Sequence, residues 1–196
     1  MTKQILICGD SFAADWRIEY PDAQGWPNLL ATEYQINNLA QAGCSEYRIL
    51  QQLRSADLTK YDLVIVSHTS PYRLYVKEHP VHHRSRLHAN SDLIYNDIKE
   101  HAKDNPQLHS IVNYFEQYVD LDYQRDIHGL IYQEIAKLLS VANHVHITHS
   151  PWSIAEQPKN MLNFEKLHKQ QPGLINHYSE QGNQKVFQKI KSYIDA

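Results

Sequence analysis

Short apolar runs separated by longer amphipathic stretches set the pattern of this chain. Residues 3–8, 63–67 and 145–148 are rich in Ile, Leu and Val, as expected of buried strands, and a weaker strand candidate covers 34–38. Apolar positions at helical spacing predict the remaining elements, which are helices at about 26–33, 45–54, 91–103, 105–119, 123–142 and from 180 to near the end. Because strands alternate with helices, we predict an α/β fold of three layers, α/β/α, around a central parallel sheet of four to five strands.

Length and charge narrow the possible partners. The 196 residues fit one compact domain spanning 1–196, and 19 basic against 22 acidic residues give a net charge of −3. This balance provides no general attraction to nucleic acid or anionic membrane, and no apolar run approaches the roughly 18 residues that span a bilayer. The first strand begins too close to Met1 for a secretion signal, so we expect a cytoplasmic protein with Cys8 and Cys44 as buried, inert thiols.

The first apolar run ends in Gly9-Asp10-Ser11. Ligands of open α/β sheets bind beyond the carboxyl ends of the strands, where Ser11 is expected to lie. Ser11 is therefore a candidate nucleophile, although a serine after a strand is also commonly a turn residue or a helix cap. For Asp10 we favour a structural role, in which its carboxylate accepts hydrogen bonds from loop backbone.

Two further segments complete a pattern with Gly9-Asp10-Ser11. Residues 38–45 read Asn-Leu-Ala-Gln-Ala-Gly-Cys-Ser, and residues 177–183 read His-Tyr-Ser-Glu-Gln-Gly-Asn. In this order, and over nearly the full length, the chain resembles the SGNH (GDSL-type) hydrolases, whose sheet is flavodoxin-like. The resemblance implies Ser11 as nucleophile, His177 as general base and Gly43 as a backbone N–H donor to the oxyanion. It also implies a small-molecule ester substrate, with no cofactor and no metal.

The chain departs from that family at two places. The third family block contains an asparagine that binds the oxyanion, but residues 67–73 here read Ser-His-Thr-Ser-Pro-Tyr-Arg. The hydroxyl of Thr69 or Ser70, or the ring N–H of His68, is a candidate replacement, and a capped strand-to-loop turn is the structural alternative. The family aspartate three residues before the histidine is replaced by Leu174. A backbone carbonyl, Asn176, or an acid elsewhere such as Asp15 or Asp22 would then have to orient His177.

Histidines are concentrated in residues 79–88, which read His-Pro-Val-His-His-Arg-Ser-Arg-Leu-His. This segment has no helical or strand periodicity and lacks the ligand spacing of a known zinc motif, so we interpret it as an exposed, solvated or substrate-facing loop. We expect residues near the fourth strand to help form one wall of the ligand-binding cleft at the carboxyl ends of the strands. These residues are His146, Thr148, His149, Ser150, Pro151 and Trp152.

Two hypotheses of function follow. The first is a serine esterase that uses a Ser–His dyad to remove or transfer a small acyl group on a polar carrier, such as a sugar. The alternative is a catalytically weak or inactive protein of the same fold that binds carbohydrate or acyl ligands. A flavodoxin-like nucleotide-binding protein is disfavoured, because the loop from Gly9 to Trp16 has a single glycine and no phosphate-binding pattern.

Overall fold

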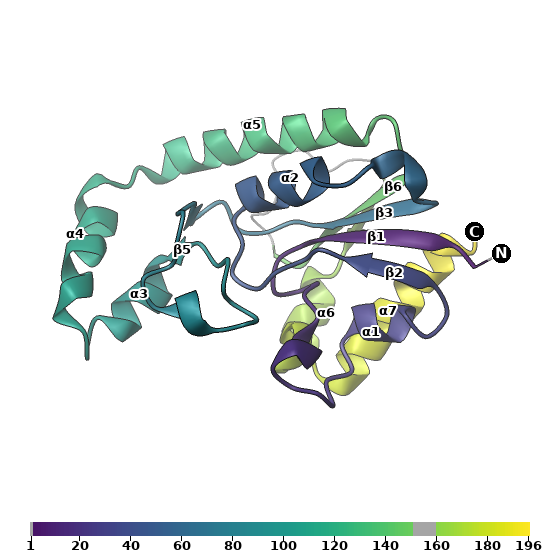
Figure 1. Cartoon of the computed structure of the whole chain (residues 1–196), viewed down its shortest axis with the longest axis horizontal. Coiled ribbons are helices and arrows are strands. Elements are labelled where there is room, and N and C mark those ends of the chain that lie inside the picture. The colour runs from purple at the N-terminus through teal and green to yellow at the C-terminus, as the bar shows by residue number, and fades with distance from the viewer. Residues whose placement is uncertain (1, 151–159) are drawn as a thin grey trace.

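A five-stranded sheet, parallel throughout, forms the centre of the molecule (Figure 1). The computed structural model describes residues 2–150 and 160–196. The strand order is β2–β1–β3–β6–β7, which is the order of flavodoxin-like sheets. The strands are β1 (Gln4–Gly9), β2 (Gln35–Asn38), β3 (Leu63–Ser67), β6 (His144–Thr148) and β7 (Met161–Asn163).

Helices cover both faces of this sheet, so the α/β/α architecture expected from the sequence is confirmed (Figure 1). One face is covered by α2 (Glu46–Arg54) and α5 (Leu121–Leu139). The other is covered by α1 (Trp26–Leu30), α6 (Glu165–Gln170) and α7 (Glu180–Ile194). A segment beyond the end of the sheet holds α3 (Tyr95–His101), α4 (His109–Tyr118) and the antiparallel pair β4 (Arg73–Leu74) and β5 (Leu93–Ile94).

The side chains of β1 point alternately to the two faces of the sheet and so belong to two separate hydrophobic clusters. Ile5 and Ile7 pack in a cluster with residues of α1 and α7, whereas Leu6 and Cys8 pack with residues of α2 and α5. Successive side chains of a strand point to opposite faces, so a continuous apolar run is what a strand covered on both sides requires. This double burial explains why β1 was recognisable from the sequence.

Several elements differ from the sequence-based expectation. The short β7 and α6 were not predicted, and neither was the pair β4–β5. The helix expected at 91–103 begins at Tyr95, since Ser91 and Asp92 precede β5 and do not cap a helix. Asp92 is fully buried and accepts hydrogen bonds from backbone N–H groups of Ser45 and Val76.

In the described ranges 2–150 and 160–196, no helix combines the length and apolar content needed to cross a membrane. The longest of them, α5, spans 19 residues but carries acidic and basic side chains along its length.

Candidate functional site

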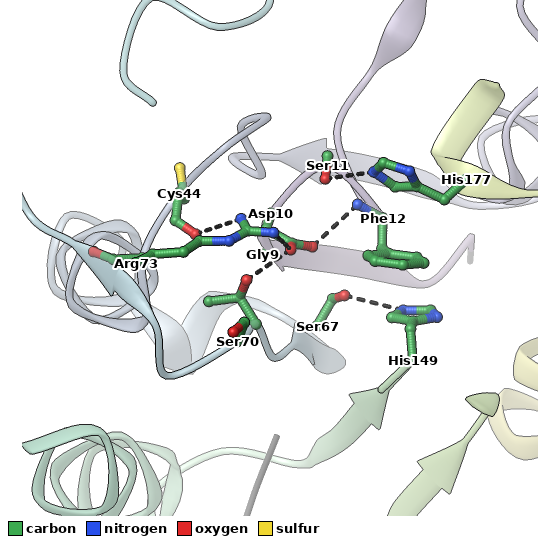
Figure 2. A network of polar contacts seen from close by, with 12 residues as sticks. Gly9, Asp10, Ser11, Phe12, Cys44, Ser67, Ser70, Arg73, His149 and His177 are labelled. Atoms are coloured by element: carbon green, nitrogen blue, oxygen red, sulfur yellow. Dashed lines mark hydrogen bonds and ion pairs between the residues drawn. The ribbon is translucent and has the colours of Figure 1, made fainter. Parts of the chain in front are cut away.

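Ser11 and His177 meet at the end of β1. Nε2 of His177 lies 2.7 Å from Oγ of Ser11, although the two residues are 166 positions apart (Figure 2). Ser11 follows β1 in a turn, and His177 ends a short 3-10 helix (Ile175–His177) before α7. A serine hydroxyl and an imidazole at this distance form the contact that nucleophilic catalysis by serine requires.

The end of β1 is held by a buried amide. Gln52 of α2 accepts from the backbone N–H of Gly9 at 2.8 Å and donates to its carbonyl at 3.1 Å. A Cβ on Gly9 would lie 2.7 Å from Cβ of Ser67 on the neighbouring strand, so only glycine fits here. The Gln52 hydrogen bonds and the close contact at Gly9 thus fix the end of β1, from which the turn that carries Ser11 begins.

Asp10 organises the turn and does not contact His177. Its Oδ1 accepts from the backbone N–H of Phe12 at 3.0 Å. Its Oδ2 accepts from the Thr69 hydroxyl at 2.8 Å and lies 3.0 Å from the guanidinium of Arg73 (Figure 2). This is the structural role expected for the aspartate from the sequence, extended to the loop after β3.

The carbonyls around Ser11 are occupied, whereas its N–H is not. The indole of Trp16 donates to the Ser11 carbonyl at 2.9 Å, and the indole of Trp26 donates to the Phe12 carbonyl at 2.7 Å. Among the described residues, no hydrogen-bond acceptor faces the backbone N–H of Ser11. An N–H without an acceptor beside a nucleophile is available to bind a developing oxyanion.

The backbone before α7 adopts an uncommon conformation. Asn176 and His177 both have positive φ, at 50° and 62°. Asn and His are among the residues that tolerate this region best, yet each such residue still costs on the order of 1–3 kcal/mol. Asn176 donates to the carbonyl of Ala14 at 2.9 Å, and Asn183 donates to the carbonyl of Ile175 at 2.9 Å. Hydrogen bonds to both neighbouring segments thus support the strained turn that presents His177 to Ser11.

Aromatic packing holds the ring of His177. Its centroid lies 4.4 Å from that of Phe12 and 6.0 Å from that of Trp16. Leu174, three residues before His177, is 59% exposed, and within the described residues no group accepts a hydrogen bond from Nδ1. Burial is the main cause that lowers the pKa of His177 below its ordinary value of 6.5. The ring is therefore neutral near pH 7, as a general base must be.

Gly43 has a backbone conformation that favours glycine. Its φ is +79°, and a Cβ at this position would overlap the side chain of Ser91. In the part of the chain that the structure describes, its N–H has no acceptor, while its carbonyl accepts from the N–H of Asp92 at 3.0 Å. Gly43 thus joins Ser11 as a backbone group with a free N–H.

The side chains of His68, Thr69 and Ser70, predicted as candidate oxyanion donors, differ in whether their hydrogen atoms are already donated. The Thr69 hydroxyl donates to Asp10, and both ring nitrogens of His68 are engaged, Nδ1 with Glu46 at 2.5 Å and Nε2 with His146 at 2.7 Å. Among residues 2–150 and 160–196, Ser70 only accepts, from the N–H of Tyr72 at 3.3 Å, so its hydroxyl proton is free to be donated. Of the three, Ser70 alone can act as a donor without giving up a bond.

Arg73 was not singled out from the sequence. Its guanidinium bonds to the carbonyl of Cys44 at 2.8 Å and to the carboxylate of Asp10 at 3.0 Å (Figure 2). It thereby joins the segments that carry Ser11 and Gly43 to the loop after β3. Sequence pattern does not reveal this link, because the pairing spans 63 positions between Asp10 and Arg73.

A buried carboxylate forms a second polar centre behind this loop. Glu46, at the start of α2, accepts from the N–H of Thr69 at 3.1 Å and lies 2.5 Å from His68 and 3.4 Å from His128. Burial alone would raise the pKa of Glu46, but attraction to His68 and the hydrogen bonds from His128 and His68 outweigh it, so that pKa is lowered. Because the pKa of Glu46 is lower in the folded than in the unfolded state, its ionised carboxylate stabilises the fold at pH values above the unfolded-state pKa. This stability is lost as the pH falls through the folded-state pKa.

Glu46→Gln is expected to destabilise the fold by about 3–5 kcal/mol at pH 7, the range for breaking a buried charge pair from one side. The free energy of unfolding from urea denaturation measures this loss. Glu134→Gln is the control, because Glu134 pairs with Arg54 on the surface, where such a pair contributes about 0–1 kcal/mol. Equal losses in the two variants would show that the buried network does not hold the loop.

A cavity of about 430 Å³ lies beside the Ser11 turn. Phe12 stacks on the ring of His149 at 4.3 Å, so one aromatic ring separates His149 from His177 (Figure 2). His149 bonds to the Tyr178 hydroxyl at 2.6 Å, whereas His146 packs on the opposite face with His68. The described lining is mixed, with Asp10, Phe12, His68, Thr69, Ser70, Arg73, His149, Ser150, Glu165, His168 and Lys169. Pro151 and Trp152, expected in this wall, lie outside the described residues.

Cys8 and Cys44 are free and buried. Burial raises the pKa of both thiols, that of Cys44 to about 12. Since the thiolate is the reactive form, neither is an active thiol at neutral pH.

Comparison with known proteins assigns the chain to no family. No family model matches the sequence, and a search of curated proteins finds no significant match.

Proposed function

We propose that the protein is a serine esterase of the SGNH (GDSL) type, which cleaves or transfers a small acyl group on a polar carrier. The observation that carries this proposal is the 2.7 Å contact between Ser11 and His177, formed by segments from the two ends of the chain. The neutral imidazole, the free N–H groups of Ser11 and Gly43 and the strained turn at His177 support it.

In the proposed reaction Ser11 Oγ forms a bond to the ester carbonyl carbon while Nε2 of His177 takes its proton. The carbonyl oxygen becomes negative and is stabilised by the N–H groups of Ser11 and Gly43, with the hydroxyl of Ser70 as a further donor. His177 then protonates the leaving alcohol as the bond to it breaks. A water molecule, deprotonated by the same imidazole, releases the acid and restores Ser11.

We expect slow turnover. No carboxylate orients His177 among the described residues, and loss of that group in a triad lowers kcat by about 10⁴-fold. Aromatic packing by Phe12 and Trp16 can hold the His177 ring in place, as the carboxylate of a triad does. It does not stabilise the positive charge of the imidazolium. The same gap is the specific support for the alternative function, a module that binds carbohydrate or acyl ligands without cleaving them.

Hydrolysis of p-nitrophenyl esters from acetate to octanoate distinguishes these functions. The proposal predicts saturable turnover that is highest for the short acyl chains. Binding of acylated sugars in calorimetry, with no ester cleavage above the buffer rate by the same protein, would support the binding module and contradict the esterase.

The pH dependence of kcat/KM follows from His177. The base works only when neutral, so the rate falls as the pH drops through the pKa of the free enzyme. Since burial lowers that pKa, the midpoint of the acidic limb is expected below 6.5. Initial rates between pH 4.5 and 9 measure it, and a midpoint above 7 would contradict this environment for the ring.

A further inference from the structure

Three imidazoles converge on one carboxylate outside the Ser11 site. Nε2 of His82 lies 3.0 and 3.2 Å from the two carboxylate oxygens of Asp97. Nε2 of His101 lies 3.7 Å from Oδ1, and Nε2 of His79 lies 3.6 Å from Oδ2. His82 begins a short 3-10 helix (His82–Arg84), and Asp97 and His101 occupy consecutive turns of α3. The cluster therefore joins the histidine-rich loop to a helix.

His79 contradicts the expectation of a fully exposed loop. It is only 1% exposed, and its buried Nε2 has no hydrogen-bond partner within the described structure. Its Nδ1 accepts from the backbone N–H groups of Val81 and His82, at 3.2 and 3.1 Å. In the neutral ring the proton is thus on Nε2, which lies 3.6 Å from Oδ2 of Asp97 without forming a hydrogen bond.

One imidazole is enough to pair with a carboxylate, so the convergence of three needs another explanation. We propose that His82, His101 and Asp97 bind a zinc ion, with His79 donating its Nε2–H to the second oxygen of Asp97. Zinc binds imidazole nitrogen and carboxylate oxygen at about 2.0–2.2 Å, which places tetrahedral ligand atoms about 3.3 Å apart. The distances from Oδ1 of Asp97 to Nε2 of His82 and of His101, 3.2 and 3.7 Å, bracket this spacing. Ligand atoms of His79, His82 and Asp97 also lie within 4.8 Å of one another.

The tautomer of His79 decides its role. Coordination through Nε2 would require the proton to move to Nδ1, where two backbone N–H groups already point. His79 instead lies beside Oδ2 as a donor, while Oδ1 lies 3.2 Å from Nε2 of His82 and 3.7 Å from Nε2 of His101. Partners of this kind orient metal-ligating carboxylates in many sites.

His82 and His101 have no competing contact that would prevent coordination. In the described chain each ring nitrogen of the two residues is free except for Nε2, which faces Asp97. Their rings lie 5.4 Å apart in a T-shaped arrangement. Because His101 is exposed at the helix surface, the fourth position remains open to water.

The bound ion would fasten the loop at 79–84 to α3. From there the ring of His82 contacts that of His88 at 5.4 Å, and His88 contacts Trp16 at 6.5 Å. Trp16 in turn bonds to the Ser11 carbonyl. The zinc site is thus a structural clamp whose existence does not depend on the proposed esterase activity.

Calorimetric titration of chelator-treated protein with zinc sulfate tests the clamp, together with metal analysis after gel filtration. We expect one zinc per chain and a higher Tm with zinc, and no binding of Mg²⁺ at the same concentrations. Asp97→Asn and His82→Gln should abolish stoichiometric binding, and His101→Gln should weaken it at least tenfold. His79→Gln should retain one zinc per chain with about 10–100-fold lower affinity, the usual effect of losing an outer partner.

His83→Gln is the matched control, because His83 is an exposed neighbour in the same short helix. It should bind zinc as the unchanged protein does. Should Asp97→Asn fail to fold, the surface variant His101→Gln still decides the question. Zinc binding that is weak, or equal in the unchanged protein, His82→Gln and His101→Gln, would overturn the proposal.

Discussion

Replacing Ser11 with Ala is expected to lower kcat for p-nitrophenyl acetate by about 10²-fold, because the site lacks the carboxylate of a full triad. Loss of a serine nucleophile removes the covalent step, and the residual rate then comes from binding and oxyanion stabilisation alone. Its hydroxyl contacts only His177 among the described residues, so the variant should fold normally, with a Tm close to that of the unchanged protein.

Ser140→Ala is the control for this experiment, since Ser140 is an exposed residue that bonds only to the carbonyl of Lys137 at the end of α5. It should retain full activity. If Ser11→Ala keeps more than a tenth of the activity while Ser140→Ala is unchanged, another group performs the attack.

His177→Ala should have a loss of similar size, about 10²-fold in kcat, because nucleophile and base act as one unit. The two effects should not add, so the double variant with Ser11→Ala should be no slower than either single variant. Steady-state kinetics of the three proteins measure this, and added imidazole should partly restore His177→Ala but not Ser11→Ala.

His168→Ala is the matched control for the base. The ring of His168 lies only 6.5 Å from that of His177 and 5.0 Å from Phe12, but it does not contact Ser11. We expect less than a tenfold change in kcat. An equal loss of kcat in His177→Ala and His168→Ala would indicate that the loss comes from disturbing the aromatic cluster, and not from removing the proton acceptor.

Most strands of the sheet could be predicted because the signal is local. Strands such as β1 and β3 are covered on both faces and so are apolar at every position. By contrast, β7 has three residues and α6 has six, too few for a period to be recognised. Their positions come from packing against β6 and the core beneath it.

Part of the site was predictable for a different reason. Ser11 and His177 lie in short segments whose residues and order resemble a known pattern, so their meeting could be expected before the structure was seen. The residues that hold the site together have no such signal. Arg73 reaches Asp10, and Glu46 reaches His68 and His128, across separations that only the folded chain brings together.

The histidine-rich loop has partners that the spacing within residues 79–88 does not reveal. Within 79–88 the histidines lack an ordered metal-binding pattern, but two partners of the cluster, Asp97 and His101, come from α3. They stand four positions apart, so both lie on one face of that helix. Burial of His79 and convergence on a single carboxylate appear only in three dimensions.

Labelling with a fluorophosphonate probe, followed by mass spectrometry of the peptides, tests the central claim most directly. The probe forms a stable phosphonyl adduct with an activated serine. We predict one adduct per chain on Ser11, with labelling slowed at least 10²-fold in His177→Ala and absent in Ser11→Ala. Labelling that is no faster than in Ser11→Ala, or an adduct on another serine such as Ser70, would contradict the account.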